Sequence, residues 1–152
     1  MPERHADWLR QAKRDLAHAR HAAEDGDYEW SCFAAQQGAE KAVKAVYQRL
    51  GAVAWGHSVT MLLTNLPETC HPPETLVERA KALDKHYIPT RYPNGFEQGA
   101  PMDYYTRAEA ERSIEDAQAI FHFCKDILVG YAGGDGETRN RRASDESAAS
   151  GG

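Results

Sequence analysis

The sequence predicts an all-α protein, an antiparallel up-and-down bundle of four to five helices. Three observations favour this fold class. Apolar residues recur every three or four positions through most of the chain, which is the spacing of one helix face. No segment of useful length alternates apolar and polar residues as a half-buried strand does. Glycine and proline fall between the periodic segments, where they punctuate helices and leave short connections.

Length and composition limit the class of protein. With 152 residues, 41% of them hydrophobic, the chain suits one globular domain. A net charge of −5 argues against a general nucleic-acid coat, because no overall excess of Lys and Arg displaces counterions. The net charge does not exclude a local basic patch. The three cysteines lack a disulfide spacing, so we expect reduced thiols and a cytoplasmic location. Neither a signal peptide nor a bilayer-spanning apolar run is expected, so no membrane partner is predicted.

The first two helices are predicted at about residues 2–25 and 27–50. In the first, one apolar stripe is formed by Trp8, Ala12, Leu16, Ala19 and Ala23. Asp25-Gly26-Asp27 ends it, and the short turn sends the next helix back antiparallel. The second helix is the most periodic segment, has a broad apolar face rich in alanine, and ends at Gly51.

Two further helices are predicted in the middle of the chain. Ser58 is the expected N-cap of a short helix that stops at Pro67. The fourth helix begins at Pro73 or Glu74 and must stop at Ile88, because Pro89 disfavours α geometry in the preceding residue.

The last helix is predicted at about residues 104–131, after a connection over 88–103 without regular structure. We expect this helix and the helix at 27–50 to lie antiparallel. Residues 133–152 are rich in Gly, Ser and charge, so the folded domain is predicted to be 1–132 and the tail to be disordered.

Most of the residues with recognisable chemistry lie around the end of the fourth helix. There, cations stand next to aromatic side chains: Lys85, His86, Tyr87, Arg91 and Tyr92. Such a set suits an anionic, stacked ligand such as a nucleotide or RNA. Gln37 and Lys41 of the second helix could line the groove that faces this corner.

Each of these residues also has a purely structural interpretation. His86 could be an exposed histidine at a helix end. Arg91 could be an ion-pair partner of Asp84 or Glu40 that pins the loop. The tyrosines could close the bundle. His57 is either a second basic group near the site or a packing residue. For metals, Cys70-His71 and His122 with Cys124 lack ligand spacing, so neither a metal nor another cofactor is predicted.

The order of motifs resembles the HEPN family (higher eukaryotes and prokaryotes nucleotide-binding domain). The resemblance covers about residues 6–128 and is carried by two strings, FAAQQGAEKAVKA at 33–45 and LDKHYIPTRYPN at 83–94, with His57-Ser58 between them. It implies an antiparallel helical bundle that is often a homodimer. Many members are paired with a minimal nucleotidyltransferase as toxin–antitoxin-like systems, and others bind nucleotides.

A large subset of the family are metal-independent endoribonucleases that use an Arg/His pair across a dimer. The candidate pair here is Arg79 with His86, although Arg14 and His21 have the same spacing. The Arg91-Tyr92-Pro93 string resembles the nucleotide-binding branch instead. Three hypotheses follow: a nucleotide- or RNA-binding protein working with a nucleotidyltransferase, an endoribonuclease, and a non-catalytic helical interaction module.

Overall fold

The computed structural model describes residues 4–149, with side chains described as far as Tyr131, and confirms the all-α class. Within that range there are no strands, and the six α-helices are α1 (His5–Glu24), α2 (Tyr28–Leu50), α3 (Val59–Thr64), α4 (Glu74–Asp84), α5 (Pro101–Tyr104) and α6 (Arg107–Ala149). Single 3₁₀ turns lie at Glu68–Cys70 and Pro93–Gly95. None of the described helices is long and apolar enough to cross a bilayer.

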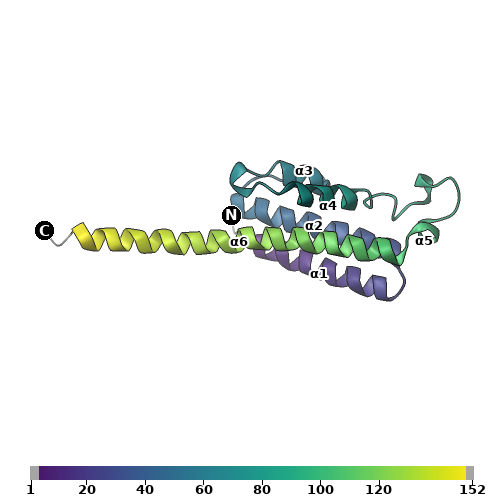
Figure 1. Cartoon of the computed structure of the whole chain (residues 1–152), viewed down its shortest axis with the longest axis horizontal. Coiled ribbons are helices and arrows are strands. Elements are labelled where there is room, and N and C mark those ends of the chain that lie inside the picture. The colour runs from purple at the N-terminus through teal and green to yellow at the C-terminus, as the bar shows by residue number, and fades with distance from the viewer. Residues whose placement is uncertain (1–3, 150–152) are drawn as a thin grey trace.

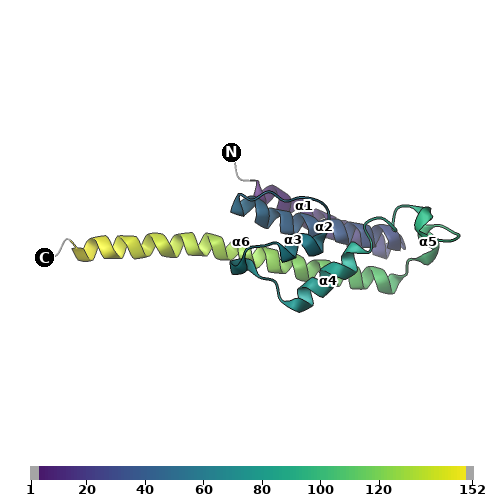
Figure 2. The same cartoon turned by 90° about the horizontal axis from the view of Figure 1, so that it is seen from above.

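Helix α2 is the centre of the bundle. It packs against α1, α3, α4 and α6, and the four long helices run roughly side by side (Figures 1 and 2). Its closest neighbour is α1: a Cβ added at Gly38 would lie 3.0 Å from Leu16 Cδ2 and 3.2 Å from the Ala12 carbonyl oxygen. The absence of a side chain at Gly38 therefore lets α1 and α2 approach this closely.

The predicted antiparallel relation between the second and last helices is wrong, because α2 and α6 run in the same direction (Figure 1). Near the start of both helices, the Ser113 hydroxyl donates to Cys32 Sγ at 3.4 Å. Near the other end of α2, Arg49 Cζ lies 5.4 Å from the Tyr131 ring centroid. In chain order, α4 is the one return pass between α2 and α6, so α6 is antiparallel to α4 (Figure 1). Helix α2 is antiparallel to α1.

Helix α4 ends at Asp84, four residues before the end predicted at Ile88. Pro89 cannot donate a backbone hydrogen bond, and the chain continues as tight turns in which His86 N–H donates to the Leu83 carbonyl. Side chains then replace the missing helical bonds. Thr90 Oγ1 donates to the His86 carbonyl at 2.7 Å, and the Arg91 guanidinium donates to the Tyr87 carbonyl.

The connection predicted to be irregular contains the one-turn helix α5, and α6 begins at Arg107 rather than at residue 104. The later start follows from Thr106, whose hydroxyl accepts from the Glu109 backbone N–H at 3.2 Å and so caps the new helix. Ser58 caps α3 as predicted, accepting from the Met61 N–H.

Asp84 joins α4 to the start of α3. Its carboxylate accepts from the backbone N–H groups of Val59 and Thr60, both at 2.9 Å, and from the hydroxyls of Ser58 and Thr60 at 3.1 and 2.6 Å. The first N–H groups of a helix have no partners within it, and a negative charge is favourable there. One carboxylate thus fixes where α3 begins and where the segment after α4 leaves the bundle.

The backbone of α6 continues as a helix to Ala149, whereas the sequence predicts an irregular tail from residue 133. The continuation extends past the other helices in both views (Figures 1 and 2). Whether residues 133–152 contribute to folding stays a prediction.

We predict that Asp84→Ala lowers the free energy of unfolding by about 2–3 kcal/mol, because several donors at the start of α3 lose a charged acceptor. Urea denaturation measures the change. Asp126→Ala, which removes an exposed aspartate from α6, is the matched control and should change stability by less than about 0.5 kcal/mol. Equal stabilities of the two variants would contradict the role given to Asp84.

Truncation after Ala132 should leave the melting temperature unchanged within about 2 °C. The removed segment has no large apolar residue with which to stabilise the bundle. Calorimetry of the full and shortened chains tests this, and a drop of several degrees would show that the segment packs on the domain.

Candidate functional site

The structure divides the predicted site residues between two sides of the segment that follows α4. Tyr87, Arg91 and Tyr92 lie with Phe33 of α2. His86 contacts Tyr105, just before α6, and Arg79 contacts Asp116 of α6. Lys85 is exposed. The single corner expected from the sequence is therefore two separate clusters.

Arg91 is held over aromatic rings. Its Cζ lies 4.4 Å from the ring centroid of Phe33, 4.8 Å from that of Tyr87 and 5.3 Å from that of Tyr92. Its Nε and Nη2 donate to the Tyr87 carbonyl at 3.0 and 2.8 Å. These contacts fix the plane of the guanidinium before any ligand arrives.

The expected alternative, an ion pair of Arg91 with Asp84 or Glu40, does not form. Asp84 accepts from the start of α3, and Glu40 binds His57 and Lys44 instead. Among the described side chains no carboxylate lies within ion-pair distance of Arg91, which is half-buried. Its positive charge is thus oriented by the protein but not neutralised by it.

A pocket of about 270 Å³ lies beside this cluster between α1 and α2. Its wall includes Trp30, Phe33, Gln37 and Lys41, so the predicted positions Gln37 and Lys41 do face a cavity. Phe33 belongs to both the pocket and the Arg91 cluster, and its ring meets that of Trp30 edge-on at 6.2 Å. Lys41 is paired with Asp15 at 2.6 Å.

Trp30 and Phe33 were not among the predicted site residues. The signal for them was present in the sequence, since positions 30, 33, 37 and 41 follow the spacing of one helix face. Helical spacing alone did not indicate that this face borders a cavity, because the same stripe would suit contact with a neighbouring helix.

The second cluster places Arg79 and His86 against α6. Arg79 Nη1 donates to Asp116 Oδ1 at 2.8 Å, and the side chain of Asp116 is only 17% exposed. Burial lowers the pKa of His86, although Glu109 and Asp116 oppose that shift. Burial also raises the pKa of the Asp116 carboxyl, against the effect of Arg79. His86 is therefore favoured in its neutral form, while the charge of Arg79 is already neutralised.

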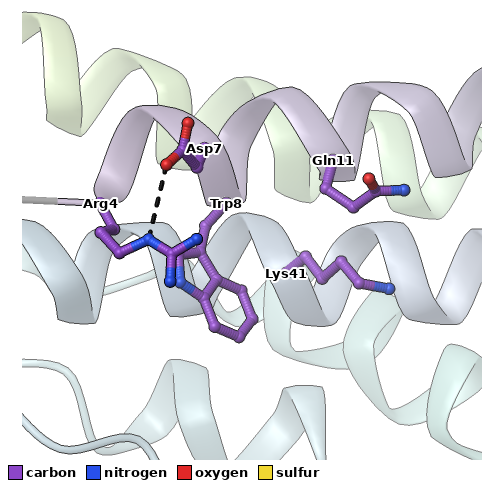
Figure 3. Close-up of a pocket in the computed structure, with 5 residues that line it drawn as sticks. All are labelled: Arg4, Asp7, Trp8, Gln11 and Lys41. Carbon is purple, nitrogen blue, oxygen red and sulfur yellow. Dashed lines mark ion pairs between the residues drawn. The ribbon is translucent and has the colours of Figure 1, made fainter.

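A larger pocket, of about 320 Å³, lies near the start of α1. It is lined by Arg4, Asp7, Trp8, Gln11 and Lys41, and Figure 3 shows the Trp8 indole with the side chains of Arg4 and Lys41 beside it. Both cations are paired, Arg4 with Asp7 and Lys41 with Asp15. We therefore assign the candidate site to the smaller pocket next to the unpaired Arg91.

In the described part of the chain, no three His, Cys, Asp or Glu side chains come together as metal ligands would. The described contacts give the site aromatic surfaces, hydrogen-bonding groups and one uncompensated cation. Chemically, such a site can hold a planar group and an anion at the same time.

Known proteins resemble this chain in sequence and in structure. "Putative toxin MJ1304" of Methanocaldococcus jannaschii is 28% identical over 130 residues, which cover 80% of this chain and 86% of that protein. The crystal structure of TT1696 from Thermus thermophilus is 50% identical with a TM-score of 0.80, covering 82% of this chain and 98% of that one.

Two further crystal structures are similar. ST0689, an archaeal HEPN homologue, is 43% identical with a TM-score of 0.72, covering 84% of this chain and 99% of that one. A HEPN domain protein (tm0613) from Thermotoga maritima is 45% identical with a TM-score of 0.67, covering 81% and 98%. The HEPN domain model matches residues 5–127. With most of its length matched in sequence and in structure, the chain belongs to the HEPN domain family.

Proposed function

We propose that this protein is a toxin-like HEPN module that binds a nucleotide or single-stranded RNA in the cytoplasm. The observation that carries the proposal is Arg91, a half-buried guanidinium oriented by three aromatic rings and a carbonyl. No described carboxylate neutralises it. Phosphate is an anion whose oxygens a guanidinium can engage with two parallel hydrogen bonds.

The hydrogen-bond capacity of Arg91 supports the same ligand. A guanidinium carries five N–H donors, and the Tyr87 carbonyl engages only Nε and Nη2. Nη1 donates to no other group in the described part of the chain. A phosphate oxygen would give these donors a charged acceptor and would be neutralised in return.

The neighbouring pocket supports a stacked base. Trp30 remains 49% exposed and its ring meets Phe33 at the pocket wall. Gln37 and Lys41 add polar groups that could recognise a base edge. The volume of the pocket suits a base better than a whole nucleotide, so we place the base there and the phosphate at Arg91.

We also propose a protein partner, a minimal nucleotidyltransferase, as in the toxin–antitoxin-like pairs that the family resemblance implies. The toxin designation of the Methanocaldococcus jannaschii relative supports this proposal. The net charge of −5 agrees with a protein that binds nucleic acid at one local site rather than along its whole surface.

The two rival functions receive less support from the geometry. In an endoribonuclease built on Arg79 and His86, Arg79 would have to release the Asp116 carboxylate before it could bind a phosphate of RNA. Asp116 already holds Arg79 in an ion pair. A purely structural interaction module gives no reason for an unneutralised Arg91 beside an open pocket.

Arg91→Ala should weaken binding of AMP or a short single-stranded RNA by about 1–3 kcal/mol, a roughly 5- to 150-fold rise in Kd. Fluorescence anisotropy with labelled RNA measures this, and circular dichroism shows whether the helices persist. Lys125→Ala, an exposed cation on α6, is the control and should leave Kd unchanged. If Arg91→Ala melts the protein while the folded fraction binds normally, Arg91 only fixes the loop.

The family resemblance also leads us to propose a homodimer. Large apolar side chains outside the pocket remain exposed, including Met61 at 62% and Ile88 at 52%. Their burial against a second copy would remove apolar area from water. Multi-angle light scattering at micromolar concentration should give twice the chain mass of 16.9 kDa. A monomer at all accessible concentrations would refute this assembly.

A further inference from the structure

We propose that the RNA bound at Arg91 continues along the groove between α1 and α2 and stacks a second base on Trp8. The inference rests on the proposed function and deepens it, because it assigns the ligand as a single-stranded oligonucleotide rather than a mononucleotide. It also gives a role to the larger pocket near the start of α1.

The two pockets between α1 and α2 adjoin each other. The pocket of about 270 Å³ is lined by Trp30, the pocket of about 320 Å³ is lined by Trp8, and Lys41 lines both. Asp15 of the smaller pocket accepts from Gln11 Nε2 of the larger one at 2.9 Å. It also accepts from Lys41 Nζ at 2.6 Å. These polar side chains lie where the pockets meet, so the pockets are two parts of one groove.

The groove is longer than one nucleotide. Trp8 lies near the start of α1, and Trp30 lies near the start of the antiparallel α2. The Ser31 hydroxyl donates to the Ala19 carbonyl at 2.7 Å, so Trp30 lies level with the later part of α1. From Trp8 to Ala19 the helix rises by about 17 Å at 1.5 Å per residue. One nucleotide cannot reach both indoles, whereas an oligonucleotide can.

The rim of this groove on α1 is basic. One row of the helix carries side chains spaced by four, four and three residues: Arg10, Arg14, His18 and His21. All of them are exposed, and His18 itself lines the smaller pocket. This row contrasts with the net charge of −5 of the whole chain. A basic track beside aromatic surfaces is the arrangement with which proteins bind single strands.

The two carboxylates that line the groove are already paired. Asp15 belongs to the ion pair at the junction of the pockets. Asp7 lies 3.5 Å from Arg4 Nε and 3.6 Å from Arg10 Nη1. Arg14, by contrast, has no ion-pair partner among the described residues. A phosphate backbone along this rim would give Arg14 a charged acceptor, so the charges favour a polyanion over an apolar protein helix in this groove.

Trp8 supplies the second stacking surface. Figure 3 shows its indole with the side chains of Arg4 and Lys41 on either side. The pair of Arg4 with Asp7 has both side chains more than half exposed, and such pairs contribute little to stability. Arg4 can therefore exchange Asp7 for a phosphate of the strand. The indole can stack on any of the bases, because each has a flat aromatic face.

Phe33 links this track to the anion site. It lines the smaller pocket, and its ring centroid lies 4.4 Å from Arg91 Cζ. A strand with a phosphate on Arg91 and a base beside Trp30 can therefore continue past His18 toward Trp8.

Fluorescence anisotropy with labelled oligoadenylates of about two to ten nucleotides tests the proposal. The longer strands should bind the wild type at least about fivefold more tightly than the dinucleotide does, because a second base gains a stacking partner. Trp8→Ala should raise the Kd of the longer strands roughly 5- to 150-fold and leave that of the dinucleotide within about twofold. Trp55→Ala is the matched control, since this tryptophan is 83% exposed in the connection before α3, and it should change neither Kd.

Arg14→Ala tests the track without altering the packed side of α1, because Arg14 is exposed. It should lower the slope of log Kd against log salt by about 0.7 for the longer strands, the value for one phosphate contact of a single strand. Arg20→Ala is its control. Arg20 is exposed and follows Gln11 by nine residues, which places it about half a turn around α1 from the groove, so the slope should not change.

The results also separate the track from the proposed function. Equal Kd values for the dinucleotide and the longer strands, with both dependent on Arg91, would remove the track and keep the Arg91 site. If Trp8→Ala changes the oligomeric state in light scattering but not the Kd of the longer strands, a second copy of the chain occupies the groove and the track is refuted. Absence of RNA binding by the wild type would remove both proposals.

Discussion

The organisation of this protein depends on the carboxylate of Asp84. It is the last residue of α4, and it accepts four hydrogen bonds from Ser58, Val59 and Thr60 at the start of α3. The start of α3 places His57, and the end of α4 begins the turns that carry Tyr87 and Arg91. A single charged group thus sets the relative position of two segments that are far apart in the sequence.

Helix α2 supplies the other half of the arrangement. On one face, Gln36 and Glu40 bind the backbone and ring of His57, and Phe33 lies under Arg91. On the adjoining face, Gln37 and Lys41 line the pocket shared with α1. These polar groups are buried or half-buried and have partners, so they fix one geometry instead of merely filling the core. The central helix is therefore both the packing centre of the bundle and the floor of the proposed RNA site.

Much of the fold followed from local patterns in the sequence. The apolar stripe of α1 was predicted as far as Ala19, but beyond it Ala22 is buried and the expected Ala23 is not. The Ser58 cap and the Gly51 stop were predicted, because each depends on residues within one helical turn. The direction of α6 relative to α2 was predicted wrongly. That direction depends on how many helices cross the bundle between the two, which is a property of the whole chain and not of either helix. The start of α6 was missed because the Thr106 cap competes with aromatic residues that suit a helix equally well.

The candidate site was predicted less completely, for a physical reason. Sequence proximity grouped His86 with Arg91, but residues five apart in a chain of tight turns need not face the same way. The structure turns His86 toward Tyr105 and Arg91 toward Phe33. Conversely, Glu40 and His57 are separated by a helix end and a loop, so only the fold could bring them within 3.1 Å. A crystal structure with a short single-stranded RNA tests the central claim directly. Our account predicts a phosphate on Arg91 and a base in the Trp30 pocket. RNA bound between Arg79 and α6, with Arg91 uncontacted, would contradict it.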